Sequence, residues 1–87
     1  MYLHLGKNTV IKTKDIVGIF DMDTSTISKN TRDYLAKAEK DGRVINVSTE
    51  LPKSFVVCRD KEGIKVYISQ ISSQTLQKRN FNFLKEV

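Results

Sequence analysis

Two apolar-rich segments joined by a short polar link constrain the fold of this chain more than any other feature. Residues 54–59 (Ser-Phe-Val-Val-Cys-Arg) and 64–69 (Ile-Lys-Val-Tyr-Ile-Ser) are rich in β-branched and aromatic residues, and Asp-Lys-Glu-Gly occupies positions 60–63 between them. Such residues favour strands, and a glycine in the link can adopt the positive φ that a short hairpin loop requires. The sequence therefore predicts a β-hairpin over residues 54–69.

Further strands are predicted on both sides of this hairpin. Residues 2–5 alternate, and the turn-forming Gly-Lys-Asn-Thr at 6–9 leads into a second short run at 10–12, a pattern that could form another hairpin. Residues 16–20 (Ile-Val-Gly-Ile-Phe) are nearly all apolar, which predicts a strand covered on both faces at the centre of the sheet. Residues 44–48 are also rich in strand formers.

Two helices complete the predicted fold. Capping side chains precede residues 26–41, where apolar residues recur at helical spacing, and Gly42 is well placed to end that helix. Ser72 or Ser73 can cap a second, short helix, which residues 80–87 either continue or follow as a tail. The predicted class is α+β, a small β-rich single domain of about five or six strands with one main helix and a short C-terminal helix.

The size of the chain limits its core. With 87 residues, of which 39% are hydrophobic, one domain with a modest core is expected, and burial at a subunit interface would add to its stability. The single cysteine, Cys58, excludes an intrachain disulfide and is predicted to be a small buried hydrophobe. Residues 1–10 contain no continuous apolar stretch, so neither a secretory signal nor a membrane span is expected and a cytoplasmic location is predicted.

The charge of the chain favours a polyanionic partner. Fifteen Lys and Arg against ten Asp and Glu give a formal charge of +5, although the basic residues are spread along the sequence and could simply form a solvated surface. We expect double-stranded DNA to be contacted by basic residues at turns and element ends, with neutral hydrogen bonds from nearby hydroxyl groups. The predicted DNA-binding residues are Lys7, Lys12, Lys14, Lys53, Lys78 and Arg79; the hydroxyl groups are those of Ser72, Ser73 and Thr75; and a second possible patch comprises Lys29, Arg32, Lys37 and Lys40.

Catalytic and cofactor chemistry find little support in the sequence. The one histidine, His4, lies in an alternating segment without a nucleophile motif, so no enzyme activity or small-molecule substrate is expected. Asp21 and Asp23 precede the predicted helix and are expected to cap it rather than to bind a metal. Residues 6–9 lack the pattern of a phosphate-binding loop, and residues 26–41 form a solitary helix rather than a helix-turn-helix, so no cofactor is predicted and DNA contacts are expected from loops and element ends.

Three blocks of the sequence resemble a known bacterial family. They are residues 2–20, ending in Asp15-Ile-Val-Gly-Ile-Phe20; the Pro52-Lys-Ser-Phe-Val-Val57 stretch; and residues 68–79, which end in Leu-Gln-Lys-Arg. Together they resemble the extracellular matrix regulators of the RemA and RemB type, with the first two blocks more similar to the RemB type. The resemblance implies that residues 1–79 form a DNA-binding regulator that assembles into rings and activates biofilm-matrix genes, followed by a tail or helix extension at 80–87.

The sequence departs from the RemA type at positions where that type carries arginines. Asp15 falls at one of them, with Lys14 beside it, and Glu50-Leu-Pro-Lys53 replaces a loop that carries others, so that Lys53 alone keeps basic character there. Two hypotheses follow. The first is a non-enzymatic transcriptional regulator that acts as a homo-oligomeric ring on DNA. The alternative is a structural or protein-interaction oligomer without direct DNA binding, assembled through sheet edges and residues 81–87.

Overall fold

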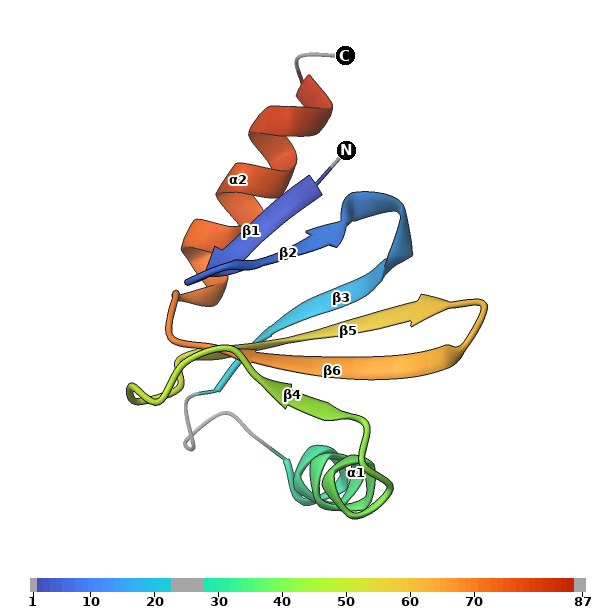
Figure 1. The fold of residues 1–87 in the computed structure, drawn as a ribbon. Helices are drawn as coiled ribbons and strands as arrows, with labels where there is room; N and C mark the ends of the chain where they lie inside the picture. The colour runs from blue at the N-terminus through green and yellow to red at the C-terminus, as the bar shows by residue number, and fades with distance from the viewer. Residues whose placement is uncertain (1, 23–27, 86–87) are drawn as a thin grey trace.

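The computed structural model describes residues 2–22 and 28–85, with side chains as far as residue 79. The described residues form six strands, a short 3-10 turn and two helices (Figure 1). The elements are β1 (Tyr2–Gly6), β2 (Thr9–Lys12), η1 (Thr13–Asp15), β3 (Ile16–Asp21), α1 (Lys29–Lys40), β4 (Val44–Asn46), β5 (Ser54–Asp60), β6 (Gly63–Ser69) and α2 (Ser73–Lys85). The predicted α+β class is confirmed.

The strands form two sheets. β1 and β2 pair as an antiparallel hairpin, and a four-stranded sheet has the order β3-β5-β6-β4. The predicted hairpin is the centre of that sheet: β5 and β6 pair antiparallel from Ser54↔Ser69 to Asp60↔Gly63, and Gly63 has a φ of 117°. β4 runs parallel to β6, as expected for a strand reached through the crossover helix α1.

The prediction that residues 16–20 form the sheet centre is wrong. β3 pairs only with β5 in the described sheet, and so it is an edge strand. Ile16 and Ile19 pack against the core, but Val17 and Phe20 point to the opposite face and remain exposed. The continuous apolar run therefore reflects one buried face and one open apolar face, rather than burial on both sides.

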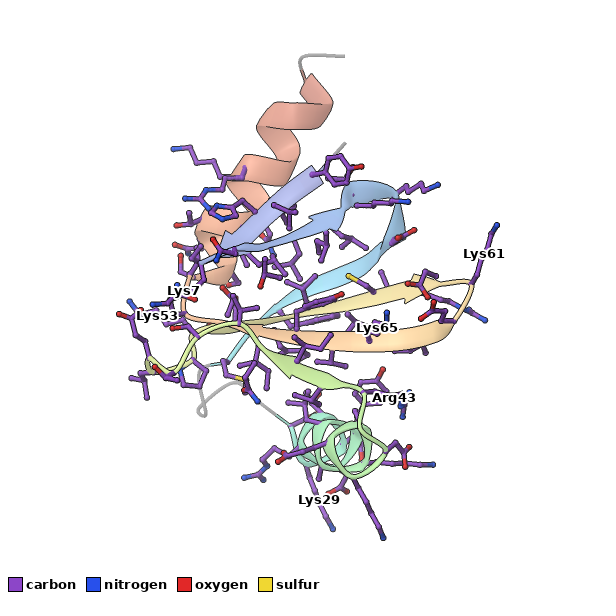
Figure 2. The ribbon with its side chains drawn as sticks, in the orientation of Figure 1. Lys7, Lys29, Arg43, Lys53, Lys61 and Lys65 are labelled. Carbon is purple, nitrogen blue, oxygen red and sulfur yellow. The ribbon has the colours of Figure 1, made fainter. Side chains whose placement is uncertain are left out.

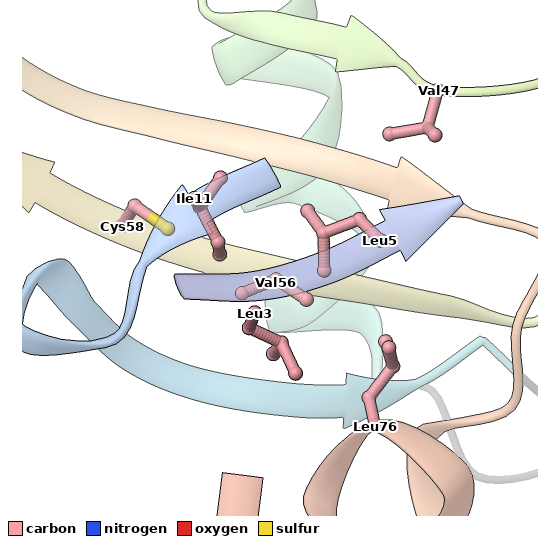
Figure 3. Packing of buried hydrophobic residues seen from close by; sticks show 7 residues of the cluster. All are labelled: Leu3, Leu5, Ile11, Val47, Val56, Cys58 and Leu76. Atoms are coloured by element: carbon pink, nitrogen blue, oxygen red, sulfur yellow. The ribbon is translucent and has the colours of Figure 1, made fainter. Parts of the chain in front are cut away.

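The four-stranded sheet separates two hydrophobic layers. On one face, β1, β2 and α2 cover a cluster that includes Leu5, Val56 and Leu76, all fully buried (Figure 3). On the other face, α1 contributes Ala38 to a cluster with Phe55 and Val66. Figure 1 shows this order of layers, with α2 and the β1–β2 hairpin on one side of the sheet and α1 on the other.

Helix α1 starts later than predicted. Ser28 has extended backbone angles and its hydroxyl accepts a hydrogen bond from the Thr31 amide at 3.1 Å, so the helix begins at Lys29 rather than at residue 26. The proposed capping residue Asp23 lies outside the described residues. Gly42, with a φ of 73°, follows the last turn as predicted.

Helix α2 is capped by the first of its two candidate serines. The Ser72 hydroxyl accepts from the Thr75 amide at 3.2 Å, while Ser73 is buried at 9% exposure. The helix continues to Lys85, but the side chains of residues 80–87 lie outside the described part of the chain. Within the described residues, no helix combines the length and the apolar character needed to cross a bilayer.

Candidate nucleic-acid interface

The structure brings two of the predicted basic residues together at the β1–β2 turn. Lys7 lies in that turn, and the Lys53 amide donates to the Ser69 carbonyl at 2.9 Å at the start of β5. The Ser69 hydroxyl in turn donates to the Leu5 carbonyl at 2.7 Å, which ties the β1–β2 hairpin to the end of β6. Lys7 and Lys53 therefore lie at the same end of the molecule (Figure 2).

Arg79 joins this end of the molecule from helix α2. Its guanidinium group donates to the His4 carbonyl oxygen at 3.3 Å, and the His4 imidazole Nε2 lies 2.8 Å from the Lys7 carbonyl oxygen. We refer to Lys7, Lys53 and Arg79 as the turn-end cations. Lys78 precedes Arg79 on the same exposed helical turn, about 100° around the helix axis.

The turn-end cations keep their charge available for an external partner. All three side chains are exposed, and the ion pairs formed among the described residues join Arg43 to Asp41 and Lys65 to Asp60 and Glu62. Because no described carboxylate neutralises Lys7, Lys53 or Arg79, their positive charge can attract a polyanion.

Lys12 and Lys14 lie elsewhere, so the structure divides the predicted site. Lys12 pairs with Tyr2 at the open end of the β1–β2 hairpin, about 13 Å from the turn at 3.3 Å per residue. Together with Lys14 it lines a cleft of about 550 Å³ between η1 and the β5–β6 hairpin. The charged residues of this mixed-charge cleft are Lys12, Lys14, Lys61 and Lys65 with Asp15, Asp60 and Glu62.

Lys61 and Lys65 were missed by the sequence prediction of basic sites. Lys61 is exposed at the tip of the β5–β6 hairpin, far from Lys7 and Lys53 in Figure 2, whereas Lys65 lies 3.8 Å from Asp60 and 3.5 Å from Glu62. These two carboxylates raise the pKa of Lys65. The tip approaches Lys14 because β3 follows η1 directly and pairs with β5, a pairing that local sequence patterns do not reveal.

The titratable groups at the base of this cleft are held in their neutral forms. Burial, with the Asp15 and Asp60 carboxylates, raises the pKa of the Cys58 thiol to about 11. Burial also raises the pKa of Tyr67. A buried thiol with a raised pKa is a poor nucleophile, which agrees with the prediction that Cys58 is a small buried hydrophobe.

The remaining sequence candidates fall into two groups. Ser73 is buried, and the Ser72 and Thr75 hydroxyl groups bond to each other at 2.9 Å within the α2 cap, so these side chains are engaged in the helix start. The second basic patch lies on α1, on the opposite side of the sheet from the turn-end cations; Lys29 marks it in Figure 2. In residues 2–22 and 28–79, no three His, Cys, Asp or Glu side chains are grouped in a way that could hold a metal ion.

Sequence comparisons with known proteins define the family to which this chain belongs. The sequence model of the RemA-like family, described as extracellular matrix regulatory protein A-like, matches residues 2–79, and the chain is a member of this family. It is 39% identical over 79 residues to extracellular matrix regulatory protein B of Bacillus subtilis (strain 168), a match that covers 91% of this chain and 89% of that relative. The resemblance seen in the three sequence blocks is confirmed.

Proposed function

We propose that this chain is a non-enzymatic, cytoplasmic transcriptional regulator that binds double-stranded DNA as a homo-oligomeric ring and controls extracellular-matrix genes. Membership of a family of matrix regulators supports the regulatory part of the proposal. The observation that carries the DNA-binding part is the convergence of Lys7, Lys53 and Arg79 at one end of the molecule, free of ion pairs with the described residues.

These cations come from three distant segments, which hydrogen bonds link to one another. The Arg79 guanidinium group donates to the His4 carbonyl oxygen, and the His4 imidazole bonds to the Lys7 carbonyl oxygen. The Ser69 hydroxyl donates to the Leu5 carbonyl oxygen, and the Lys53 amide donates to the Ser69 carbonyl oxygen. Lysine and arginine side chains on a preformed surface neutralise phosphates and release counterions, which supplies affinity with little sequence preference. Sequence preference would then come from the deformability of the bent DNA.

A single set of three cations would bind DNA weakly, and repetition around a ring overcomes this limit. Once one subunit contacts the duplex, contact by the next becomes effectively intramolecular, so several weak sites act together. The mixed-charge cleft contributes less to this model, because Asp15, Asp60 and Glu62 offset its four lysines.

Salt titration of binding to a duplex fragment tests the proposal directly. If each engaged subunit neutralises the phosphates beside Lys7, Lys53 and Arg79, the slope of log K against log salt should be on the order of −3 per engaged subunit. Replacement of the duplex by an uncharged peptide nucleic acid should abolish binding. Absence of duplex binding at low salt would reject the proposal.

The second candidate function is a protein-interaction oligomer without direct DNA binding. The replacement of family arginines at Asp15 and in the loop before Lys53 favours it, because both changes lower the positive charge available to a duplex. Parallel pull-downs with a DNA fragment and with cell lysate separate the two functions. Retention of protein partners without DNA would favour the second candidate.

A further inference from the structure

One half of the sheet face on the α1 side is not covered by any of the described residues. Helix α1 packs mainly against β4 and β6, so it shields that half of the four-stranded sheet. On the other half, Val17 is 64% exposed and Phe20 is 44% exposed, although both lie on the apolar face of β3. Large apolar side chains grouped in this way on a folded domain mark a contact surface.

This open half forms a groove with an apolar floor and no formal charge. Its volume is about 340 Å³, and it lies between α1 and strands β3 and β5. The lining residues share an apolar or neutral polar character: Val17, Phe20, Phe55 and Val57 from the strands, and Asn30, Thr31 and Tyr34 from α1.

The floor of the groove is preformed. The Phe20 ring stacks on Phe55 with centroids 5.1 Å apart and an interplanar angle of 19°. Gly18 leaves room for that ring, since a Cβ at this position would lie 2.5 Å from the Phe20 Cζ atom. A register shift between Ile16 and Gly18 places Val17 as the extra residue of a bulge, which presents its side chain at the groove edge.

The same molecule carries an apolar side chain, that of Leu51, which projects into solvent. Leu51 is 80% exposed, more than any other large hydrophobic residue in the described part of the chain. Its loop is anchored at the base, where the Lys53 carbonyl accepts from the Met22 amide and the Lys53 amide donates to Ser69, both at 2.9 Å. Pro52 fixes its own φ beside Leu51, which lowers the entropy cost of docking.

We propose that the groove receives a second copy of this chain, with Leu51 of one copy inserted between α1 and β3 of the next. Glu50, directly before Leu51, can pair with α1, whose four basic and two acidic residues give it a net charge of +2, while Lys53 lies at the other end of the same loop. Because the projection and the groove are different surfaces, the contact is head-to-tail and can be repeated until a ring closes. This inference rests on the assembly part of the proposed function and assigns it a surface.

Disulfide trapping between two variants, each with one added cysteine, tests the contact. Val17→Cys and Leu51→Cys proteins are prepared separately, mixed and mildly oxidised, with wild-type protein as the control because its own Cys58 is buried. A disulfide forms only when the two Cα atoms come within about 7 Å, so a cross-linked dimer is expected in the mixture and in neither protein alone. Cross-linking of Leu51→Cys protein to itself, or no cross-link in the mixture, would overturn the head-to-tail contact.

Light scattering on charged variants gives an independent readout. Leu51→Asp should shift the particle to the mass of a single chain at concentrations where the wild type is oligomeric. Val10→Asp is the matched control, because Val10 is also exposed, at 55%, but lies on β2 away from the groove. Equal particle masses for Leu51→Asp and wild type would contradict the inference.

The two proposals fail in different ways. If the Leu51→Asp protein remains oligomeric and still binds DNA, the groove contact is refuted and the DNA-binding proposal is supported. A disulfide between positions 17 and 51 in a protein that does not bind DNA would refute the proposed DNA-binding function and support the groove contact. A wild-type protein that scatters as a monomer would overturn the groove contact together with the ring.

Discussion

The Ser69 hydroxyl donates a 2.7 Å hydrogen bond to the carbonyl oxygen of Leu5, sixty-four positions away in the sequence. Both residues are fully buried, and the bond joins the β1–β2 hairpin to the last residue of β6. The same hydroxyl accepts from the Ile71 amide at 3.0 Å. One side chain thus fixes the β1–β2 turn that carries Lys7 against the strand end beside Lys53.

Replacing Ser69 by alanine should therefore lower the free energy of unfolding by about 1–3 kcal/mol, because the buried Leu5 carbonyl and the partly buried Ile71 amide lose a hydrogen-bond partner. Urea denaturation followed by circular dichroism measures this change. Ser48→Ala is the control: its hydroxyl accepts an exposed bond from the Glu50 amide, so its cost should stay below about 0.5 kcal/mol. Equal costs for the two variants would show that the Ser69 bonds do not contribute as described.

Reversing the turn-end cations should weaken DNA binding far more than reversing the cleft lysines. The Lys7→Glu, Lys53→Glu and Arg79→Glu triple variant places three negative charges where phosphates would approach, and its affinity should fall at least about 100-fold at low salt.

The matched control is the triple variant of Lys12, Lys14 and Lys61, each changed to Glu, which has the same change in net charge. Its loss should be at least tenfold smaller, as measured by fluorescence anisotropy with a labelled duplex. A larger loss in this control would place the interface at the mixed-charge cleft instead.

Gly18→Ala should destabilise the domain by about 1 kcal/mol through Phe20. The new methyl group would meet the Phe20 ring at 2.5 Å and force it off Phe55, with loss of the stacking energy. In a Phe20→Ala background the alanine at position 18 meets no ring, and its cost should nearly vanish. A double-mutant cycle measured by thermal denaturation gives this coupling, and additive effects would contradict it.

The free energy of unfolding should fall as the pH rises from about 9 to about 11. Burial and the Asp15 and Asp60 carboxylates raise the pKa of the Cys58 thiol from 9.0 to about 11, so the unfolded chain loses this proton first and is favoured increasingly over that range. The raised pKa values of Lys65 and Tyr67 act in the same direction. Comparison with Cys58→Ala isolates the thiol, and its pH profile should be flatter than that of the wild type.

Local sequence patterns predicted which helices and strands form better than they predicted which of these elements lie next to one another. The β5–β6 hairpin followed from a glycine in a short polar link, and the cap of α2 followed from a pair of serines. The sheet order did not follow, because an apolar run such as Ile-Val-Gly-Ile-Phe has the same composition whether its second face meets a helix or stays open. The position of β3 at the edge depends on which strands pair with it, and its open face depends on where α1 packs. Neither relationship is encoded in the residues of β3 themselves.

The candidate interface shows the same limit. Each cation was predicted from its position at a turn or element end, and each is exposed. Their division between the β1–β2 turn and the mixed-charge cleft depends on the length of one hairpin and on the pairing of β3 with β5. These are long-range relationships, so the sequence could suggest the residues but not their grouping.

Lys7 adopts a backbone conformation that suits glycine better. Its φ of 49° is the one positive value at a non-glycine position in residues 2–22 and 28–79, and left-handed backbone costs an ordinary residue about 1 kcal/mol. Lys7→Gly should therefore raise the melting temperature while it weakens DNA binding. On the proposed function, the cation at position 7 serves DNA contact at the expense of a relaxed turn, so the domain is expected to melt at a lower temperature than the same fold with glycine there.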